Sequence, residues 1–177
     1  MNKFFKKYSL PIVLKFLERR RKPVATSVSY VESKNILLLF TSDGNQKIAL
    51  VKALQNKLEK EGKNVECLYL LMSYEDMPDV HADAGMEKVE PTDFSIFGNI
   101  KKASVSRLLE KRFDILMHAD MECNDYTNLI LTKTKARCRI GRYFDKRDGQ
   151  YDMMIKMSAD KKIKVLVDQI HYYAKAM

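Results

Sequence analysis

The chain has 177 residues, 46% hydrophobic and 31% charged, which predicts one globular domain with a hydrophobic core and excludes a disordered chain. No stretch approaches the roughly 20 apolar residues of a transmembrane helix, and the N-terminus lacks the features of a cleaved signal peptide. The three cysteines form no CxxC pair, so we expect buried thiols rather than a disulfide framework or a zinc site. These features together predict a cytoplasmic protein.

The net charge of +9 is concentrated at the N-terminus. Residues 1–22 hold eight basic residues against Glu18 alone, so this segment carries +7 and the other residues together carry +2. A basic segment on a nearly neutral body favours an anionic partner, and we expect residues 3–22 to contact RNA, the ribosome or an acidic membrane surface. The candidate contact residues are Lys15, Arg19, Arg20, Arg21 and Lys22.

The same residues, 1–22, are predicted to contain an amphipathic helix. Ser9 is a suitable N-cap, and apolar residues follow it at helical spacing. Two roles remain open: either the apolar stripe packs on the domain while the bases face water, or the helix docks on a partner. We expect residues 23–34 to be a linker or an edge strand, and residues 35–177 to form a single α/β domain.

A first strand–helix–strand unit follows this segment. The continuous apolar run at residues 35–41 suits a central strand covered on both faces. Polar residues 42–45 form a turn, a helix continues until Gly62, and residues 64–71 are the next strand. Residues 72–93, with a net charge of −6, are predicted to be irregular, and a loop of that length is usually functional or braced by another segment.

A second unit is predicted further along, after a short strand at 94–97 and a short helix at 104–111. It comprises a strand at 113–117, a helix at 123–136 and a strand at 137–140. Two strands joined by a helix run parallel with a right-handed crossover. The predicted elements of this second unit are followed by a last strand at residues 151–157 and a C-terminal helix that begins at Asp160.

These elements predict a small doubly wound, mostly parallel α/β sheet of Rossmann-like type, preceded by a basic helix. The strand at 35–41 is expected to be central, with the strand at 113–117 as its neighbour. Eight apolar side chains are expected to be buried in the sheet: Leu37, Leu39, Leu68, Leu70, Ile115, Met117, Ile140 and Ile155.

Two motifs in the second unit carry a resemblance to a known family. FDILMHAD begins at Phe113 and NLILTKTKARCRIG begins at Asn128. With residues 151–155 and the C-terminal helix, they resemble an uncharacterised family of bacterial proteins of about this length, a domain of unknown function. The resemblance implies a single cytoplasmic α/β domain with no known activity. A fainter similarity is to the N-terminal half of heptosyltransferase-like glycosyltransferases, in which a strand ending in Asp is followed by a helix and an Ala/Arg-Ile-Gly strand. The matching residues here are Asp120, Ala136, Arg139, Ile140 and Gly141.

Ligands of open α/β sheets bind beyond the carboxyl ends of the strands, near the point where the strand order reverses. An imidazole at such an edge can act as a base or a ligand, and an arginine can clamp a phosphate. Alternatively, the histidine and carboxylate only hydrogen-bond the loop, and the asparagine only caps a helix. The candidate ligand-binding residues are Ser42, Asp43, His118, Asp120, Asn124 and Arg139.

Three functional hypotheses of different classes follow, and the third is a structural subunit that self-associates through an exposed apolar stripe on the first helix. The first is a non-enzymatic binding or adaptor protein that contacts an anionic macromolecule through residues 3–22. The second is an enzyme that binds a nucleotide or a sugar phosphate, a small anionic ligand, at the carboxyl edge of the sheet. The sequence contains no P-loop, no dinucleotide-binding GxGxxG and no GxSxG motif. We therefore expect neither a cofactor nor a metal, and the sequence leaves open whether the protein is an enzyme.

Overall fold

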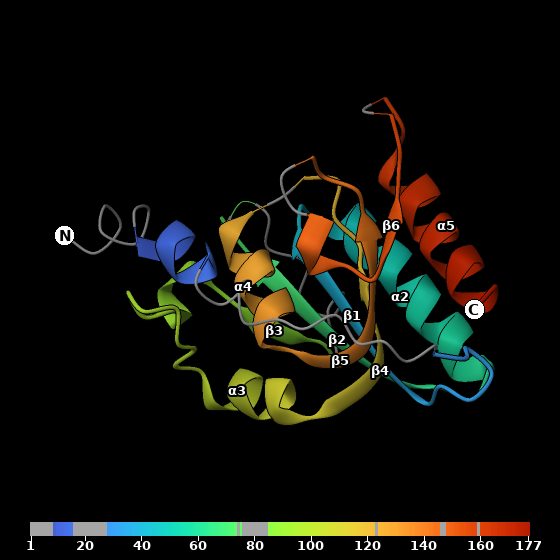
Figure 1. Ribbon diagram of the computed structural model, residues 1–177, viewed down its shortest axis with the longest axis horizontal. Coiled ribbons are helices and arrows are strands. Elements are labelled where there is room, and N and C mark those ends of the chain that lie inside the picture. The colour runs from blue at the N-terminus through green and yellow to red at the C-terminus, as the bar shows by residue number, and fades with distance from the viewer. Residues whose placement is uncertain are drawn as a thin grey trace.

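The computed structural model of the chain describes residues 9–15, 28–73, 75, 85–122, 124–145, 148–158 and 160–177. Within those residues the centre is a parallel six-stranded sheet (Figure 1). The strands are β1 (Asn35–Ser42), β2 (Asn64–Leu71), β3 (Glu87–Val89), β4 (Arg112–His118), β5 (Lys135–Arg142) and β6 (Met153–Ile155). The helices are α2 (Asn45–Lys60), α3 (Ala103–Glu110), α4 (Asp125–Lys133) and α5 (Ile163–Lys175), with 3-10 turns at Pro91–Asp93 and Asp148–Gln150. Residues 9–15 are also helical.

The strand order is β3-β2-β1-β4-β5-β6. The chain therefore builds the sheet outwards from β1 in one direction, returns to the other side of β1, and continues through β4, β5 and β6. The order reverses between β1 and β4, which makes this pair the topological switch point of a doubly wound sheet. The predicted fold class, the central position of the first strand and its neighbour are confirmed.

Strand β1 is central because its side chains are apolar on both faces. Leu37 and Leu39 are fully buried with α3 and α4, whereas Leu38 and Phe40 are buried on the opposite face with α2 and α5. This alternation follows from the two-residue period of a strand. All eight side chains that were expected in the sheet core are buried.

Helices cover both faces of the sheet, so the domain has three layers. Figure 1 shows α2 and α5 side by side on one face, with α3 and α4 on the other. The helical segment at residues 9–15 packs on the same face of the sheet as α3 and α4, where its side chains Leu10 and Leu14 are buried. Among the described helices, none has the length and apolar character needed to cross a membrane.

The N-terminal segment is only partly described. The stripe side chains Leu10 and Leu14 pack on the domain and Lys15 is exposed, while the predicted contacts at residues 19–22 lie outside the described residues. Residues 28–34 contain a turn and no strand, so the described part of the predicted linker or edge strand is not in the sheet. Tyr30 is nevertheless buried against the core.

Three predictions about local structure were wrong. The acidic segment at 72–93 was expected to be irregular throughout, but Glu87–Val89 forms β3 and pairs with β2. The predicted strand at 94–97 is a turn, in which Phe94 makes only an isolated bridge to Ile100. The helix predicted over 123–136 ends at Lys133, because the backbone of Thr134 is extended and β5 begins at the next residue.

Candidate functional site

A polar cavity of about 380 Å³ lies at the carboxyl end of the sheet, where β1 and β4 meet. Parallel strands bring their following loops to one edge, and at the switch point the helices after the two strands leave on opposite faces. Here α2 follows β1 and α4 follows β4. The residues that line the cavity are Thr41, Ser42, Asp43, Lys47, Met72, Asp120, Met121, Glu122 and Asn124.

The turn from β1 into α2 forms one wall of the cavity. Gly44 is the N-cap of α2 and has a φ of 98°. Residues with a side chain rarely adopt this backbone conformation, whereas glycine adopts it readily. No side chain caps this helix end, so the positive end of the helix dipole and its first backbone N–H groups lie beside Ser42 and Asp43. Such an arrangement suits a negatively charged group.

The side chain of Asp120 is held by several hydrogen bonds at this edge, and its residue is only 2% exposed. Its Oδ1 accepts from the backbone N–H of Thr41 at 2.8 Å and from Nζ of Lys47 at 2.6 Å. Its Oδ2 accepts from Oγ1 of Thr41 at 2.8 Å and lies 2.9 Å from Nε2 of His118. Burial alone would raise the pKa of Asp120, but the charges and hydrogen bonds of His118 and Lys47 outweigh it and hold this pKa below its usual value.

His118 lies behind Asp120 and does not line the cavity. It is fully buried, its Nδ1 lies 2.6 Å from the hydroxyl of Tyr151, and the two rings stack with centroids 5.9 Å apart. A continuous chain of contacts therefore runs from Tyr151 through His118 and Asp120 to Lys47. In this chain His118 orients the Asp120 carboxylate, and water in the cavity has no direct access to the imidazole.

Asn124 connects the two loops of the site. Its side-chain oxygen accepts from the backbone N–H of Thr127 at 2.8 Å and caps α4, while Nδ2 donates to Oγ1 of Thr41 at 3.1 Å. The capping role that was one alternative for Asn124 is thus present, and the same side chain also lines the cavity.

Arg139 is not brought to the cavity. Its residue is buried on β5, Nη2 donates to the carbonyl oxygen of Thr134 at 2.6 Å, and its backbone N–H donates to the carboxylate of Asp152. A buried guanidinium needs hydrogen-bond acceptors, and the carbonyl oxygen of Thr134 is one of them. The side chain of Arg139 therefore stabilises β5 and does not contact a ligand in the cavity. Of the six predicted side chains, the four that line the cavity are Ser42, Asp43, Asp120 and Asn124.

Sequence reasoning missed Lys47 and Tyr151. Lys47 lies one helical turn after Asp43, and its Nζ is 3.7 Å from Oδ2 of that residue. The spacing of Asp43 and Lys47 was a visible signal, since residues four apart on a helix are neighbours. Tyr151 is separated from His118 by 33 residues, and no local pattern relates the two.

The rim of the cavity carries acidic side chains. Asp43 and Glu122 are exposed, whereas the ammonium of Lys47 is already paired with Asp120. Carboxylates at a rim accept hydrogen bonds from hydroxyl groups. The site thus combines backbone donors for an anion with carboxylate acceptors for hydroxyls.

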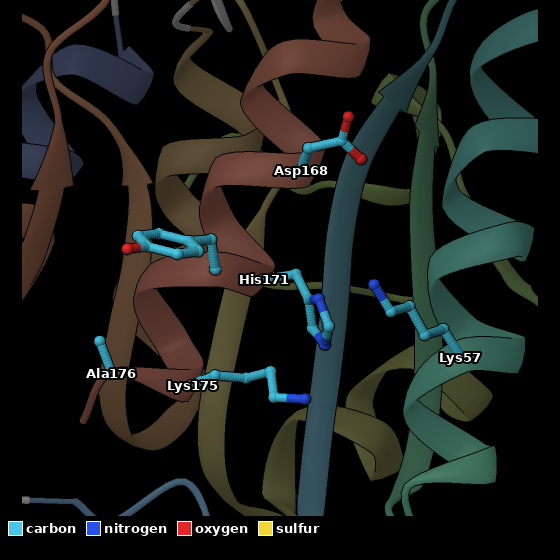
Figure 2. Close-up of a pocket in the computed structure, with 6 residues that line it drawn as sticks. Lys57, Asp168, His171, Lys175 and Ala176 are labelled. Carbon is cyan, nitrogen blue, oxygen red and sulfur yellow. The ribbon is translucent and has the colours of Figure 1, made fainter.

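A larger hollow of about 670 Å³ lies between the C-terminal halves of α2 and α5. Figure 2 shows Lys57 of α2 pointing towards α5, which contributes His171 and Lys175 to the same hollow. The carboxylate of Glu61 is contacted by His171 at 3.3 Å and by Lys175 at 3.2 Å. Cations are favoured at helix C-termini. The basic side chains of this hollow are therefore explained by their positions near the ends of α2 and α5 and by their contacts with Glu61. For this reason we regard the smaller cavity as the better candidate for a ligand site.

The fold and this cavity define the class: a doubly wound, parallel α/β protein with a polar cavity at its switch point. The chain belongs to a family of unknown function, DUF6913, which matches residues 6–177. This finding confirms the resemblance to an uncharacterised family. Searches of curated proteins and of solved structures gave no match, and the fainter similarity to heptosyltransferase-like enzymes receives no support from the comparisons.

Proposed function

We propose that the protein binds a small phosphate-bearing ligand, of the nucleotide or sugar-phosphate type, in the cavity between β1 and β4. The observation that carries this proposal is the cavity itself, which lies at the switch point beside the uncapped N-terminus of α2. Its volume of about 380 Å³ lies within the usual range of small-molecule sites, roughly 300 to 1,000 Å³.

The two ends of such a ligand fit the two kinds of polar group in the cavity. The phosphate would sit on the first backbone N–H groups of α2, next to Gly44, where the helix dipole contributes about 0.3 to 1 kcal/mol. Sugar hydroxyls would donate to the carboxylates of Asp43 and Glu122 at the rim. Because Asp120 already pairs with Lys47, their joint role is to hold the loop in shape for the ligand.

We propose ligand binding only, without a catalytic step. The buried His118 can reach a ligand only through Asp120, whose depressed pKa keeps it ionised and makes it a weak base. The ionisable groups of described residues that line the cavity are Asp43, Lys47, Asp120 and Glu122. They suit orientation of a ligand better than proton transfer.

The test is a thermal-shift and calorimetric titration with nucleoside mono- and diphosphates and with hexose phosphates. A ligand at 100 times its Kd should stabilise the protein by about 2.7 kcal/mol. Met72→Trp, at an exposed lining position, should fill the cavity and abolish this shift without lowering the melting temperature of the free protein. Phe97→Trp, at an exposed position outside the cavity, should keep the shift. If no ligand of either class stabilises the protein, or if Met72→Trp responds like wild type, the proposal is wrong.

We propose a second function, contact with an anionic partner through residues 3–22. The observation that favours it is the charge distribution, with +7 of the net +9 in residues 1–22. Affinity purification of the tagged protein with and without nuclease would separate nucleic-acid partners from others. Four neutralised phosphates predict a log–log salt slope of about −3 to −4, and replacement of Arg19, Arg20, Arg21 and Lys22 by Gln should remove that slope. Unchanged binding by this variant would contradict the proposal.

A further inference from the structure

Two apolar side chains lie at the tip of an exposed turn between β3 and α3. The turn spans residues 95–98 and is closed by a hydrogen bond of 3.0 Å from the N–H of Gly98 to the carbonyl oxygen of Ser95. Its central residues are Ile96, which is 39% exposed, and Phe97, which is 69% exposed. Central turn positions usually carry polar residues or glycine, so an isoleucine and a phenylalanine here are unexpected.

Hydrogen bonds and buried contacts at the base of the turn hold its backbone against the domain, while Ile96 and Phe97 remain exposed. The N–H of Asn99 donates to Oγ of Ser95 at 3.0 Å, and Phe94 at the base of the turn is fully buried against the ring of Tyr126. Gly98 has a φ of 74°, and a Cβ there would meet Leu129 at 2.9 Å. The backbone of the turn at Gly98 therefore packs directly on α4, and the side chain of the preceding residue, Phe97, is exposed.

The helical segment at residues 9–15 lies beside this turn. A Cβ on Gly98 would be 3.3 Å from Cγ1 of Val13, and Figure 1 shows the two segments together at the end of the molecule away from α5. Leu10 and Leu14 of the helix face the core, while Ile12 points away from it and is 71% exposed. Ile12 is adjacent to Val13 and Phe97 is adjacent to Gly98, so the exposed side chains of Ile12, Ile96 and Phe97 lie at the same end of the molecule. We call these three side chains the apolar tip; they come from two segments that are far apart in the sequence.

Each of the two segments of the apolar tip carries an exposed lysine close to it in the sequence. Lys15 on the helix and Lys101 after the turn are exposed, and Ile12 itself lies within the segment of net charge +7. An apolar tip with lysines nearby is a combination that binds acidic bilayers, because the apolar groups enter the headgroup region while each nearby base contributes through the surface potential. RNA would use the bases and would stack on Phe97, but it would gain nothing from Ile12 and Ile96, whereas a bilayer takes up all three apolar side chains.

We propose that Ile12, Ile96 and Phe97 form a membrane-inserting tip, which docks this end of the domain on an acidic lipid surface. The inference rests on the second proposed function, contact with an anionic partner through residues 3–22, and names that partner. Exposed apolar side chains with lysines nearby suit the apolar interior and the anionic headgroups of an acidic bilayer.

The chain contains no tryptophan, so single-tryptophan variants report insertion cleanly. Phe97→Trp should show a blue shift of its fluorescence with vesicles containing phosphatidylserine and no shift with pure phosphatidylcholine vesicles. Tyr172→Trp is the matched control, since Tyr172 is 69% exposed on α5, on the opposite face of the sheet, and its emission should not change. Equal shifts for the two variants would indicate non-specific adsorption and overturn the proposal.

Vesicle sedimentation measures the contribution of the tip to affinity. Phe97→Ser should weaken binding to acidic vesicles about tenfold, as expected for partial loss of a buried aromatic side chain, while Tyr172→Ser should bind like wild type. If the protein binds acidic vesicles in a salt-dependent way but Phe97→Trp shows no blue shift, the charged segment acts alone and the inserting tip is wrong. If it binds RNA and no vesicles, the tip is again wrong while the second proposed function stands.

Discussion

The Nζ atom of Lys47 lies 2.6 Å from Oδ1 of Asp120, and both side chains are more than nine-tenths buried. This ion pair joins α2 to the end of β4 at the point where the strand order reverses. Removing one member of a buried pair leaves an uncompensated charge and costs about 3 to 5 kcal/mol, whereas removing both costs less than the sum.

We therefore expect Lys47→Met and Asp120→Asn each to lower the free energy of unfolding by about 3 kcal/mol, and the double variant to lose markedly less than about 6 kcal/mol. Urea denaturation measures all three values. The pair between Lys111 and Glu66 has a similar distance of 2.8 Å but is exposed, so Lys111→Met should cost at most about 1 kcal/mol. Strict additivity at Lys47 and Asp120 would show that they are not coupled.

Gly141 determines whether Tyr151 can reach His118. A Cβ at Gly141 would lie 2.4 Å from Cε1 of Tyr151, whose ring is buried and held by its contacts with His118. Gly141→Ala should lower the free energy of unfolding by about 1 to 3 kcal/mol through overpacking. Gly149 has open space at the same position, so Gly149→Ala should change stability by less than about 0.5 kcal/mol. Similar losses for the two variants in urea denaturation would refute this account.

Glu61 should make the protein sensitive to acid. Burial alone would raise its pKa, but hydrogen bonds from Tyr30, Lys175 and His171 lower that pKa from 4.5 to about 2. Because the folded pKa lies below the unfolded value, the stabilising contribution of Glu61 is complete above about pH 5 and is lost as the pH falls towards 2.

Unfolding free energies measured across this pH range should therefore fall less steeply for Glu61→Gln than for wild type. The variant should already be less stable at pH 7, where the ionised carboxylate is missing. The neighbouring Glu59 has an exposed carboxylate on the same helix, and Glu59→Gln should keep the wild-type slope. A wild-type slope in Glu61→Gln would mean that other groups cause the acid sensitivity.

Leu39 tests the central position of β1. Its side chain is fully buried between β2 and β4 on the face covered by α3 and α4. Leu39→Ala should cost about 2 to 5 kcal/mol, from lost transfer free energy and the cavity left behind. Val31→Ala, at a position that is 86% exposed, should be nearly neutral. A loss below about 0.5 kcal/mol for Leu39→Ala in denaturant unfolding would contradict the central placement.

Two features of this protein could be predicted from its sequence alone: a sheet covered by helices on both faces, and the polar residues at the carboxyl ends of its central strands. The run from Ile36 to Phe40 is apolar without interruption and is bounded by polar residues, which favours a short strand covered on both faces. The residues that follow it, Ser42 and Asp43, and those after β4, Asp120 and Asn124, were placed at one edge because parallel strands end together. Each of these inferences needs only the short-range period of a strand or helix and the rule that βαβ units are parallel.

Tertiary structure alone decided which side chains meet. Glu87–Val89 forms a strand because it pairs with the edge of β2. Three residues are too few to show the alternation of apolar and polar side chains by which a strand is recognised in a sequence. His118 was expected at the open edge, but its ring is buried and contacts Tyr151, which is 33 residues away in the sequence. Lys47 pairs with Asp120, from which it is separated by 73 residues. The physical reason is that backbone periodicity is a local property, whereas burial obliges a polar side chain to take whichever partner the packed fold brings within hydrogen-bonding distance.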